Sequence, residues 1–254
     1  MENLRLDDKE FIMSIIKESK KIKSSDKDYS NEEIAASIDH TILKPETTPS
    51  DVLQICNEAI EYSFASVCVN SCYAPLVSNA LDDSDVKTCV VVGFPLGAMS
   101  TNAKVGEVKD AIQYGADEID MVINVGMLKE DEYQYVFNDI KAVADTAHEM
   151  NAICKVIIET SLLSDEEKVI ACLISKEAKA DFVKTSTGFN GGGATVEDIK
   201  LMKKVVGNEL QVKASGGVRS REDAINMLNA GADRIGASAG VKIVTNQESN
   251  EGGY

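Results

Sequence analysis

From about residue 33 onward, short apolar runs alternate with longer amphipathic stretches along the chain. Several runs are nearly continuous, such as Cys89 to Val92, which is typical of parallel strands covered on both faces. The pattern predicts eight strands: Ala36–His40, Ser66–Val69, Val86–Val92, Glu118–Ile123, Ile153–Ile158, Phe182–Lys184, Gln211–Ala214 and Arg234–Gly236. It predicts seven helices between these strands: Ser50–Tyr62, Ala74–Leu81, Thr101–Tyr114, Glu132–Met150, Ser164–Ala178, Val196–Val206 and Arg219–Asn229. A short closing helix is expected after the last strand.

Regular alternation of strand and helix predicts an α/β fold, and eight such units fit a (β/α)8 TIM barrel. Two segments, 115–119 and 231–235, repeat the same glycine turn from a helix into a strand. An open doubly wound sheet is the alternative. No Gly-x-Gly-x-x-Gly fingerprint follows the first strand, so the barrel is favoured.

The first 31 residues do not share this alternation. Asp7 or Asp8 can cap a helix with an apolar stripe that includes Phe11 and Ile15, and a polar link follows from Lys17 to Asn31. We therefore expect an N-terminal helical extension and linker over residues 1–31, packed on the main body or on a partner subunit. A TIM-barrel catalytic domain over 32–245 and a flexible C-terminal tail over 246–254 complete the predicted organisation.

The net charge of −16 argues against non-specific binding to nucleic acid or to an anionic membrane surface. The longest uncharged run, from Thr88 to Ala103, contains a proline and two glycines. It is also shorter than the roughly 20 residues that a spanning helix needs. We expect a soluble cytoplasmic protein with no nucleic-acid and no membrane partner. An anionic substrate would need local positive charge.

The six cysteines lie mostly in apolar segments, as expected of reduced core thiols. Cys68 and Cys72 are four residues apart but lack a second ligand pair, so they give little support to a zinc site. Of the two histidines, His148 falls in a predicted surface helix and His40 is expected to be packed or at the substrate's edge. With only two histidines in the chain, we expect no metal.

Two lysines end neighbouring strands: Lys184, and Lys213 in a second strand-and-glycine segment further along the chain. An amine attacks a carbonyl only when it is neutral, and a nearby ammonium together with burial lowers the pKa of a lysine. This pair suits Schiff-base formation. The alternative is that Lys155, Lys184 and Lys213 merely neutralise buried carboxylates such as Asp120 and Glu159, and the residues alone leave both interpretations open.

Glycine-rich loops follow the last three predicted strands, over residues 188–193, 215–219 and 236–240, the last before a short helix. In a barrel, exposed N–H groups of such loops and a helix N-terminus form a phosphate site. The pattern thus predicts a phosphate-binding half of the mouth. The alternative is that these glycines serve only as tight turns and helix ends.

Taken together, these segments resemble the 2-deoxyribose-5-phosphate aldolase family. The matching stretches run in family order from about residue 34 to 244: 38–41, 66–70, 92–97, 118–124, 155–160, 182–188 and 212–219. The resemblance implies a TIM barrel that reversibly cleaves 2-deoxy-D-ribose 5-phosphate to acetaldehyde and D-glyceraldehyde 3-phosphate. It also implies a lysine Schiff base, no cofactor, and a homo-oligomer, dimer or tetramer.

The resemblance further implies roles for particular residues. It places the Schiff-base lysine at Lys184, the lysine that tunes it at Lys213 and the proton-relay carboxylate at Asp120. The residues that it places near the substrate or its phosphate are Asp39, Cys68, Thr187, Gly188, Gly216, Gly217 and Ser238.

The chain departs from the family pattern after the last predicted strand, where Ala239 takes the place of a hydroxyl residue. Its N–H can still donate, so we expect phosphate affinity weakened by roughly 1 kcal/mol. Many relatives end in a tyrosine, so Tyr254 is a candidate visitor to the site. Another Schiff-base aldolase, a transaldolase or a non-catalytic sugar-phosphate sensor could share the same glycine loops.

Overall fold

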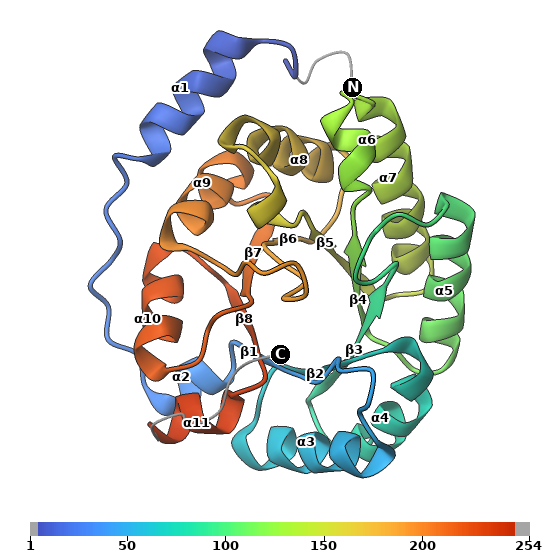
Figure 1. The fold of residues 1–254 in the computed structure, drawn as a ribbon. Coiled ribbons are helices and arrows are strands. Elements are labelled where there is room, and N and C mark those ends of the chain that lie inside the picture. Colours follow the sequence, from blue (N-terminus) through green and yellow to red (C-terminus); the bar gives the residue numbers. More distant parts are fainter. Residues whose placement is uncertain (1–4, 247–254) are drawn as a thin grey trace.

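The computed structural model describes residues 5–246, which form a closed barrel of eight parallel strands in the order β1 to β8, with helices outside it (Figure 1). The predicted (β/α)8 TIM barrel is confirmed. The strands are β1 Ile38–Thr41, β2 Ser66–Val69, β3 Lys87–Val92, β4 Glu118–Val122, β5 Ile153–Ile157, β6 Phe182–Lys184, β7 Gln211–Ser215 and β8 Arg234–Ala237.

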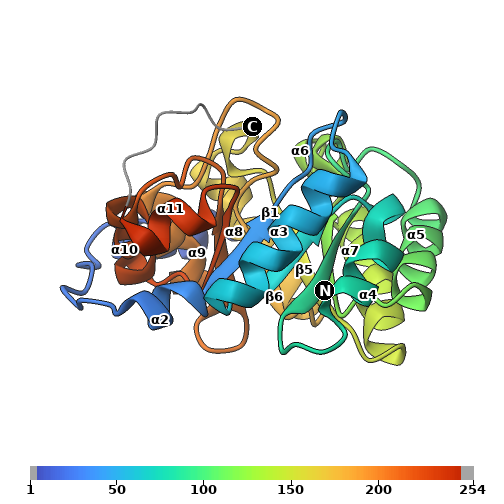
Figure 2. The ribbon, with the colours of Figure 1, turned by 90° about the horizontal axis from the view of Figure 1, so that it is seen from below.

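The predicted helices are also present, with ends shifted by two residues at most. The helices between strands and the closing helix are α3 Pro49–Tyr62, α4 Ala74–Leu81, α5 Thr101–Gln113, α7 Tyr133–Glu149, α8 Asp165–Glu177, α9 Val196–Val206, α10 Arg221–Ala230 and α11 Gly240–Thr245. Most begin with a side-chain cap, as where Ser164 accepts a hydrogen bond from the Glu167 N–H. Figure 2 shows α3 and α11 on the same flank of the barrel, where α11 contacts both α2 and α3.

The hydrophobic pattern missed several short elements. In place of a polar link up to residue 31, α1 (Lys9–Ser19) continues past Lys17, and α2 (Asn31–Ala35) precedes the barrel. Ser30 and Glu33 form a capping box that starts α2, so β1 begins at Ile38 rather than at Ala36. The other missed elements are α6 (Val125–Lys129) and two 3₁₀ turns, η1 (Ser71–Tyr73) and η2 (Thr160–Leu162).

The two faces of the barrel strands differ sharply in polarity. Residues such as Val90, Ile119 and Val183 face the helices and belong to the main apolar core. The alternate positions hold charges, and ion pairs such as Lys155–Asp39 join strands that are not neighbours, which is possible only across the interior. The buried interior of this barrel is therefore built largely from charged groups.

The N-terminal extension runs along the outside of the barrel's helices (Figure 1). Asp8 caps α1, and Ile12, Ile15 and Ile16 are buried where α1 contacts α8 and α9. The linker then crosses α10, where the Arg221 guanidinium donates a hydrogen bond of 2.6 Å to the Tyr29 carbonyl. The extension is thus fastened to three consecutive helices of the main body.

Two predictions bear on the ends of the chain and on membranes. Apart from Asn246, the predicted C-terminal tail over 246–254, with Tyr254, lies outside the described residues. Between residues 5 and 246, every helix is too short or too polar to cross a bilayer.

One buried ion pair ties α5 to α7 away from the barrel interior. The Lys104 ammonium lies 2.5 Å from the Asp139 carboxylate, and both side chains are almost fully excluded from solvent. Lys104 also donates to the Val122 carbonyl at the end of β4. Burial lowers the pKa of Lys104, and the Asp139 carboxylate opposes that shift.

Because removing one member leaves a buried unpaired charge, Lys104→Met should lower the free energy of unfolding by about 3–5 kcal/mol. Denaturant unfolding followed by circular dichroism measures this loss. Lys141→Met, which breaks the exposed 2.8 Å pair with Asp145, is the matched control and should change stability by less than about 1 kcal/mol. Equal losses in the two variants would contradict the argument.

Candidate active site

Two lysine amines converge on one carboxylate oxygen inside the barrel. Lys184 is the last residue of β6, and its Nζ lies 2.7 Å from Asp120 Oδ2. Lys213 is its register partner on β7, and its Nζ donates to the same oxygen at 2.7 Å. The structure therefore brings together the three residues to which the sequence assigned catalytic roles.

The other oxygen of Asp120 is occupied as well. Lys155 donates to Asp120 Oδ1 at 2.8 Å, and the Cys89 thiol donates to it at 3.2 Å. Burial alone would raise the pKa of Asp120, but Lys155, Lys184 and Lys213 outweigh it and hold that pKa well below its usual value. Asp120 is therefore an ionised, fully buried carboxylate that contacts three lysines.

A second carboxylate, that of Asp39, also forms an ion pair with Lys213. Asp39 is fully buried and forms ion pairs with Lys213 and with Arg234, whose Nε lies 2.9 Å from Asp39 Oδ1. Burial would lower the pKa of Lys213, but Asp120 and Asp39 raise it above its usual value. Burial would raise the pKa of Asp39, and Lys213, Arg234 and Lys155 together lower it. Lys213 is therefore an ammonium group paired with two carboxylates.

The alternative, in which the lysines only neutralise buried carboxylates, agrees with the contacts of Asp120 but not with those of Glu159. All three lysines do contact Asp120. Glu159, which follows β5 and precedes η2, instead accepts hydrogen bonds from the Thr187 hydroxyl at 2.5 Å and from the Asn190 amide at 2.8 Å. The Thr187 hydroxyl, expected near the substrate, is thus already used to hold the loop after β6.

An apolar group of residues lines the β1–β3 side of the barrel interior. Cys68 and Cys89 are register partners on β2 and β3, and they cluster with Leu43 and Val91 beneath Phe94. A hydrogen bond with Cys89 lowers the pKa of the Cys68 thiol, while burial and that same hydrogen bond raise the pKa of Cys89. This side of the interior is therefore less polar than the side that holds the lysines.

The glycine loops lie on the opposite side. Gly188, Gly216 and Gly217 have φ values of 85°, 78° and 79°, which disfavour any larger residue. A Cβ at Gly193 would come within 2.4 Å of the Gly216 carbonyl oxygen, so the loops after β6 and β7 can meet only through glycine. Ser238 is exposed just before α11. The four predicted phosphate contacts thus belong to loops at the same end of the barrel.

A divalent cation is poorly suited to this interior. Within residues 5–246, the one group of three possible ligands is Cys68, Cys89 and Asp120, whose ligand atoms lie within 4.8 Å of one another. Three ammonium groups already contact Asp120. Cys72 is exposed and outside this group, so the sequence pair of Cys68 and Cys72 does not come together as a zinc site.

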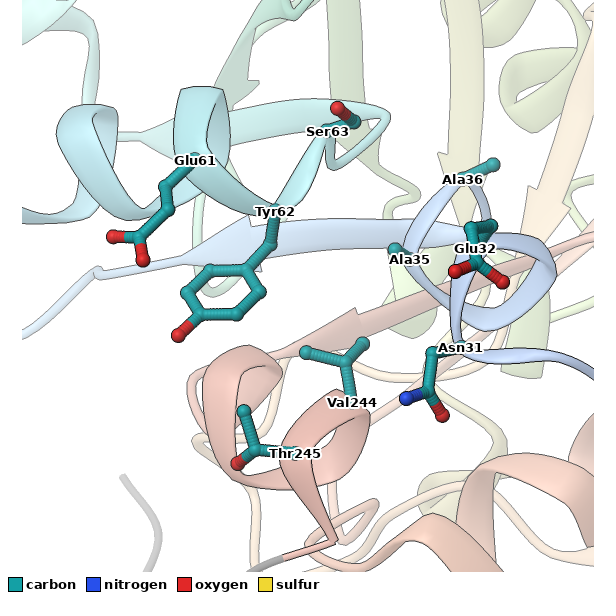
Figure 3. Close-up of a pocket in the computed structure, with 9 residues that line it drawn as sticks. All are labelled: Asn31, Glu32, Ala35, Ala36, Glu61, Tyr62, Ser63, Val244 and Thr245. Atoms are coloured by element: carbon teal, nitrogen blue, oxygen red, sulfur yellow. The ribbon is translucent and has the colours of Figure 1, made fainter.

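A separate pocket opens between α2, α3 and α11 (Figure 3). Asn31, Glu32, Glu61 and Tyr62 supply its largest polar side chains, and it shares no residue with the barrel interior. Two carboxylates and the absence of a cation among its lining residues make it unfavourable for an anionic ligand.

Sequence reasoning missed two members of the interior network, Glu118 and Arg234. Both stand at the first position of their strands, whereas functional residues were sought at the C-terminal ends. The period-two alternation along β4 could have found Glu118, because it lies two residues before Asp120 and therefore on the same face, whereas Arg234 has no such charged neighbour on β8. His40 faces away from the network, with its Nε2 2.6 Å from Glu58, and His148 lies on α7 beside Asp181.

Comparisons with known proteins show the family to which the chain is similar. The model of the DeoC/LacD family aldolases matches residues 33–246. A deoxyribose-phosphate aldolase of Finegoldia magna is 61% identical over 207 residues, which cover 82% of this chain and 96% of the relative. One of Clostridium novyi is 58% identical over 217 residues, which cover 85% and 97%.

A solved structure extends the similarity to three dimensions. The deoxyribose phosphate aldolase of Aeropyrum pernix, described as a tetramer, superposes with a TM-score of 0.82 at 32% identity, over 92% of this chain and 97% of that one. The family match spans most of the chain, and the superposition extends over the whole barrel. The chain belongs to the DeoC/LacD family of aldolases.

Proposed function

We propose that this chain is a class I aldolase that reversibly cleaves 2-deoxy-D-ribose 5-phosphate to acetaldehyde and D-glyceraldehyde 3-phosphate. The main support for this proposal is that the Nζ atoms of Lys184 and Lys213 both lie 2.7 Å from the same atom, Oδ2 of the buried Asp120. The names of the relatives at about 60% identity support the substrate. The phosphate-binding role of the glycine loops and the roles of individual residues are part of the proposal.

Lys184 is the proposed nucleophile. Its only carboxylate partner among the described residues is Asp120, whereas Lys213 has two and Lys155 has three. Loss of a proton from Lys184 therefore breaks the fewest ion pairs. The neutral amine then attacks the C1 aldehyde carbon of the open-chain sugar, and loss of water gives a protonated imine.

The imine accepts the electron pair of the C2–C3 bond as that bond breaks. The C3 hydroxyl must lose its proton at the same time, because C3 becomes the aldehyde carbon of glyceraldehyde 3-phosphate. An imine nitrogen keeps a single N–H, so Asp120 Oδ2 loses part of its bonding to Lys184 and becomes free to accept a hydrogen bond. Asp120 then relays the C3 hydroxyl proton, through a water molecule, without storing it for long.

The enamine left on Lys184 is protonated at C2 and hydrolysed, which releases acetaldehyde and the free lysine. Lys213 is the proposed source of positive charge that keeps Lys184 reactive, since its own proton is held by Asp120 and Asp39. Loop residues Gly188, Gly216, Gly217 and Ser238 would bind the phosphate, and Cys68 lines the apolar side. No step requires a metal or an organic cofactor.

The finer organisation is also proposed. We infer a barrel domain over residues 32–245 with an N-terminal extension over 1–31, which the family match over 33–246 supports. We infer a cytoplasmic homo-oligomer, dimer or tetramer, which is supported by the tetramer described for the Aeropyrum pernix enzyme.

Sodium borohydride added with 2-deoxyribose 5-phosphate should trap the imine and add the mass of the reduced adduct to the peptide that carries Lys184. Peptide mass mapping locates the label. Lys184→Met is the control and should remain unlabelled while still folding. A label on Lys155 or Lys213 in the unmodified sequence would overturn the assignment of the nucleophile.

Lys213→Leu should shift the acid limb of the kcat/KM profile to higher pH or abolish turnover. Removing this ammonium lowers the positive potential at Lys184, so Lys184 keeps its proton up to a higher pH. We expect a loss of roughly 10²-fold or more at neutral pH, as is common for groups that govern proton transfer. An unchanged profile would refute the tuning role.

Incubation with a chelator such as EDTA, followed by removal of the complex, should leave the cleavage rate unchanged, because protonated imine chemistry provides its own electron sink. A coupled assay of glyceraldehyde 3-phosphate release measures the rate. A loss of activity that an added divalent metal restores would instead favour a metal-dependent reaction.

A further inference from the structure

The barrel interior holds one connected network of ion pairs with unequal numbers of the two charges. The network is joined by contacts of 4.0 Å or less within the described residues. Its four cations and three carboxylates are Lys155, Lys184, Lys213, Arg234, Asp39, Glu118 and Asp120. With all seven groups ionised, one positive charge is in excess.

The floor of this network is formed by Glu118 and Arg234. Glu118 Oε2 lies 2.5 Å from Lys155 Nζ and 3.1 Å from Arg234 Nη2. Arg234 in turn pairs with Asp39. Neither floor residue contacts Lys184, and both stand at the N-terminal ends of their strands, at the opposite end of the barrel from the glycine loops.

Each floor residue is connected to the proposed nucleophile through a chain of ion pairs that ends at Asp120. Glu118 holds Lys155, and Lys155 binds Asp120 Oδ1 at 2.8 Å. Arg234 holds Asp39, and Asp39 pairs with Lys213, which binds Asp120 Oδ2. A change of charge at the floor therefore acts on both oxygens of the carboxylate that faces Lys184.

Other ionisable groups around Lys184 are few. The thiols of Cys68 and Cys89 lie on β2 and β3, and Glu159, which follows β5, is held by Thr187 and Asn190. The groups that face the interior from the strands are Asp39 on β1, Cys68 on β2, Cys89 on β3, Glu118 and Asp120 on β4, Lys155 on β5, Lys184 on β6, Lys213 on β7 and Arg234 on β8.

We propose that Glu118 and Arg234 are positioning residues that set, from the floor of the barrel, the excess positive charge under which Lys184 gives up its proton. This inference rests on the proposed role of Lys184 as the nucleophile. Glu118 reduces the positive potential at Lys184 and so favours the ammonium form of that residue. Arg234 increases the positive potential and so favours the neutral amine. Their balance fixes the pH at which the amine becomes reactive.

Because Glu118 and Arg234 carry opposite charges, neutralising each of them should shift the pH dependence of the reaction in opposite directions. Glu118→Gln removes a negative charge, so the Lys184 proton leaves more readily and the acid limb of kcat/KM should move to lower pH. Arg234→Gln removes a positive charge, so the acid limb should move to higher pH. With an effective dielectric constant near 20, each shift should be about one pH unit. The measurement is kcat/KM against pH with 2-deoxyribose 5-phosphate.

Three further variants separate charge from structural damage. The double variant E118Q/R234Q restores the excess of one positive charge, so its acid limb should return toward that of the parent. Arg234→Lys keeps the charge and should leave the acid limb within about 0.3 pH units of the parent. Lys104→Met, which breaks the buried pair with Asp139 outside the network, should destabilise the protein without moving the acid limb.

The rate at which borohydride labels Lys184, measured against pH, provides the second readout. Shifts in the same direction for E118Q and R234Q, or no shift in either, would overturn the proposal. Should E118Q fail to fold, the comparison of R234Q with R234K decides the question. Failure of the proposed function is distinguishable, because the parent protein would then neither cleave the substrate nor become labelled at Lys184.

Discussion

The ion pairs around Asp120 are the interaction on which the rest of this structure depends. A carboxylate with no exposed surface is stable only if its charge is matched, and here three lysines from β5, β6 and β7 match it. Because each lysine approaches from a different strand, the contacts also hold those strands in register. The same carboxylate thus supports the barrel's interior and brings the reactive amine to its place.

The barrel accommodates so many buried charges because hydrophobic burial is supplied by the outward face of its strands and not by the inward face. Apolar residues on the outward face pack against the helices and supply the hydrophobic stabilisation, so the inward face does not have to. A closed sheet leaves no strand edge open, and its interior excludes water from the ion pairs. Electrostatic effects between the lysines are therefore stronger than they would be on the surface.

Much of the fold could be predicted because strands and helices alternate with clear hydrophobic patterns. The strands β2 and β6 and the helices α4 and α9 have the bounds that the pattern predicted. The convergence of Lys184 and Lys213 could also be predicted, since Lys184 ends β6 and Lys213 lies on the next strand, β7. Glu118 and Arg234 were missed because their importance comes from the register between strands, which pairs residues far apart in the chain. Similarly, only the folded loop shows that Thr187 binds Glu159.

The N-terminal extension precedes the region that the family model matches, which begins at residue 33. Its first helix covers the outer face of α8 and α9 with three buried isoleucines. A neighbouring molecule that approached this face would compete with a tethered helix whose local concentration is always high. Any subunit contact over the outer face of α8 and α9 would therefore first have to displace α1.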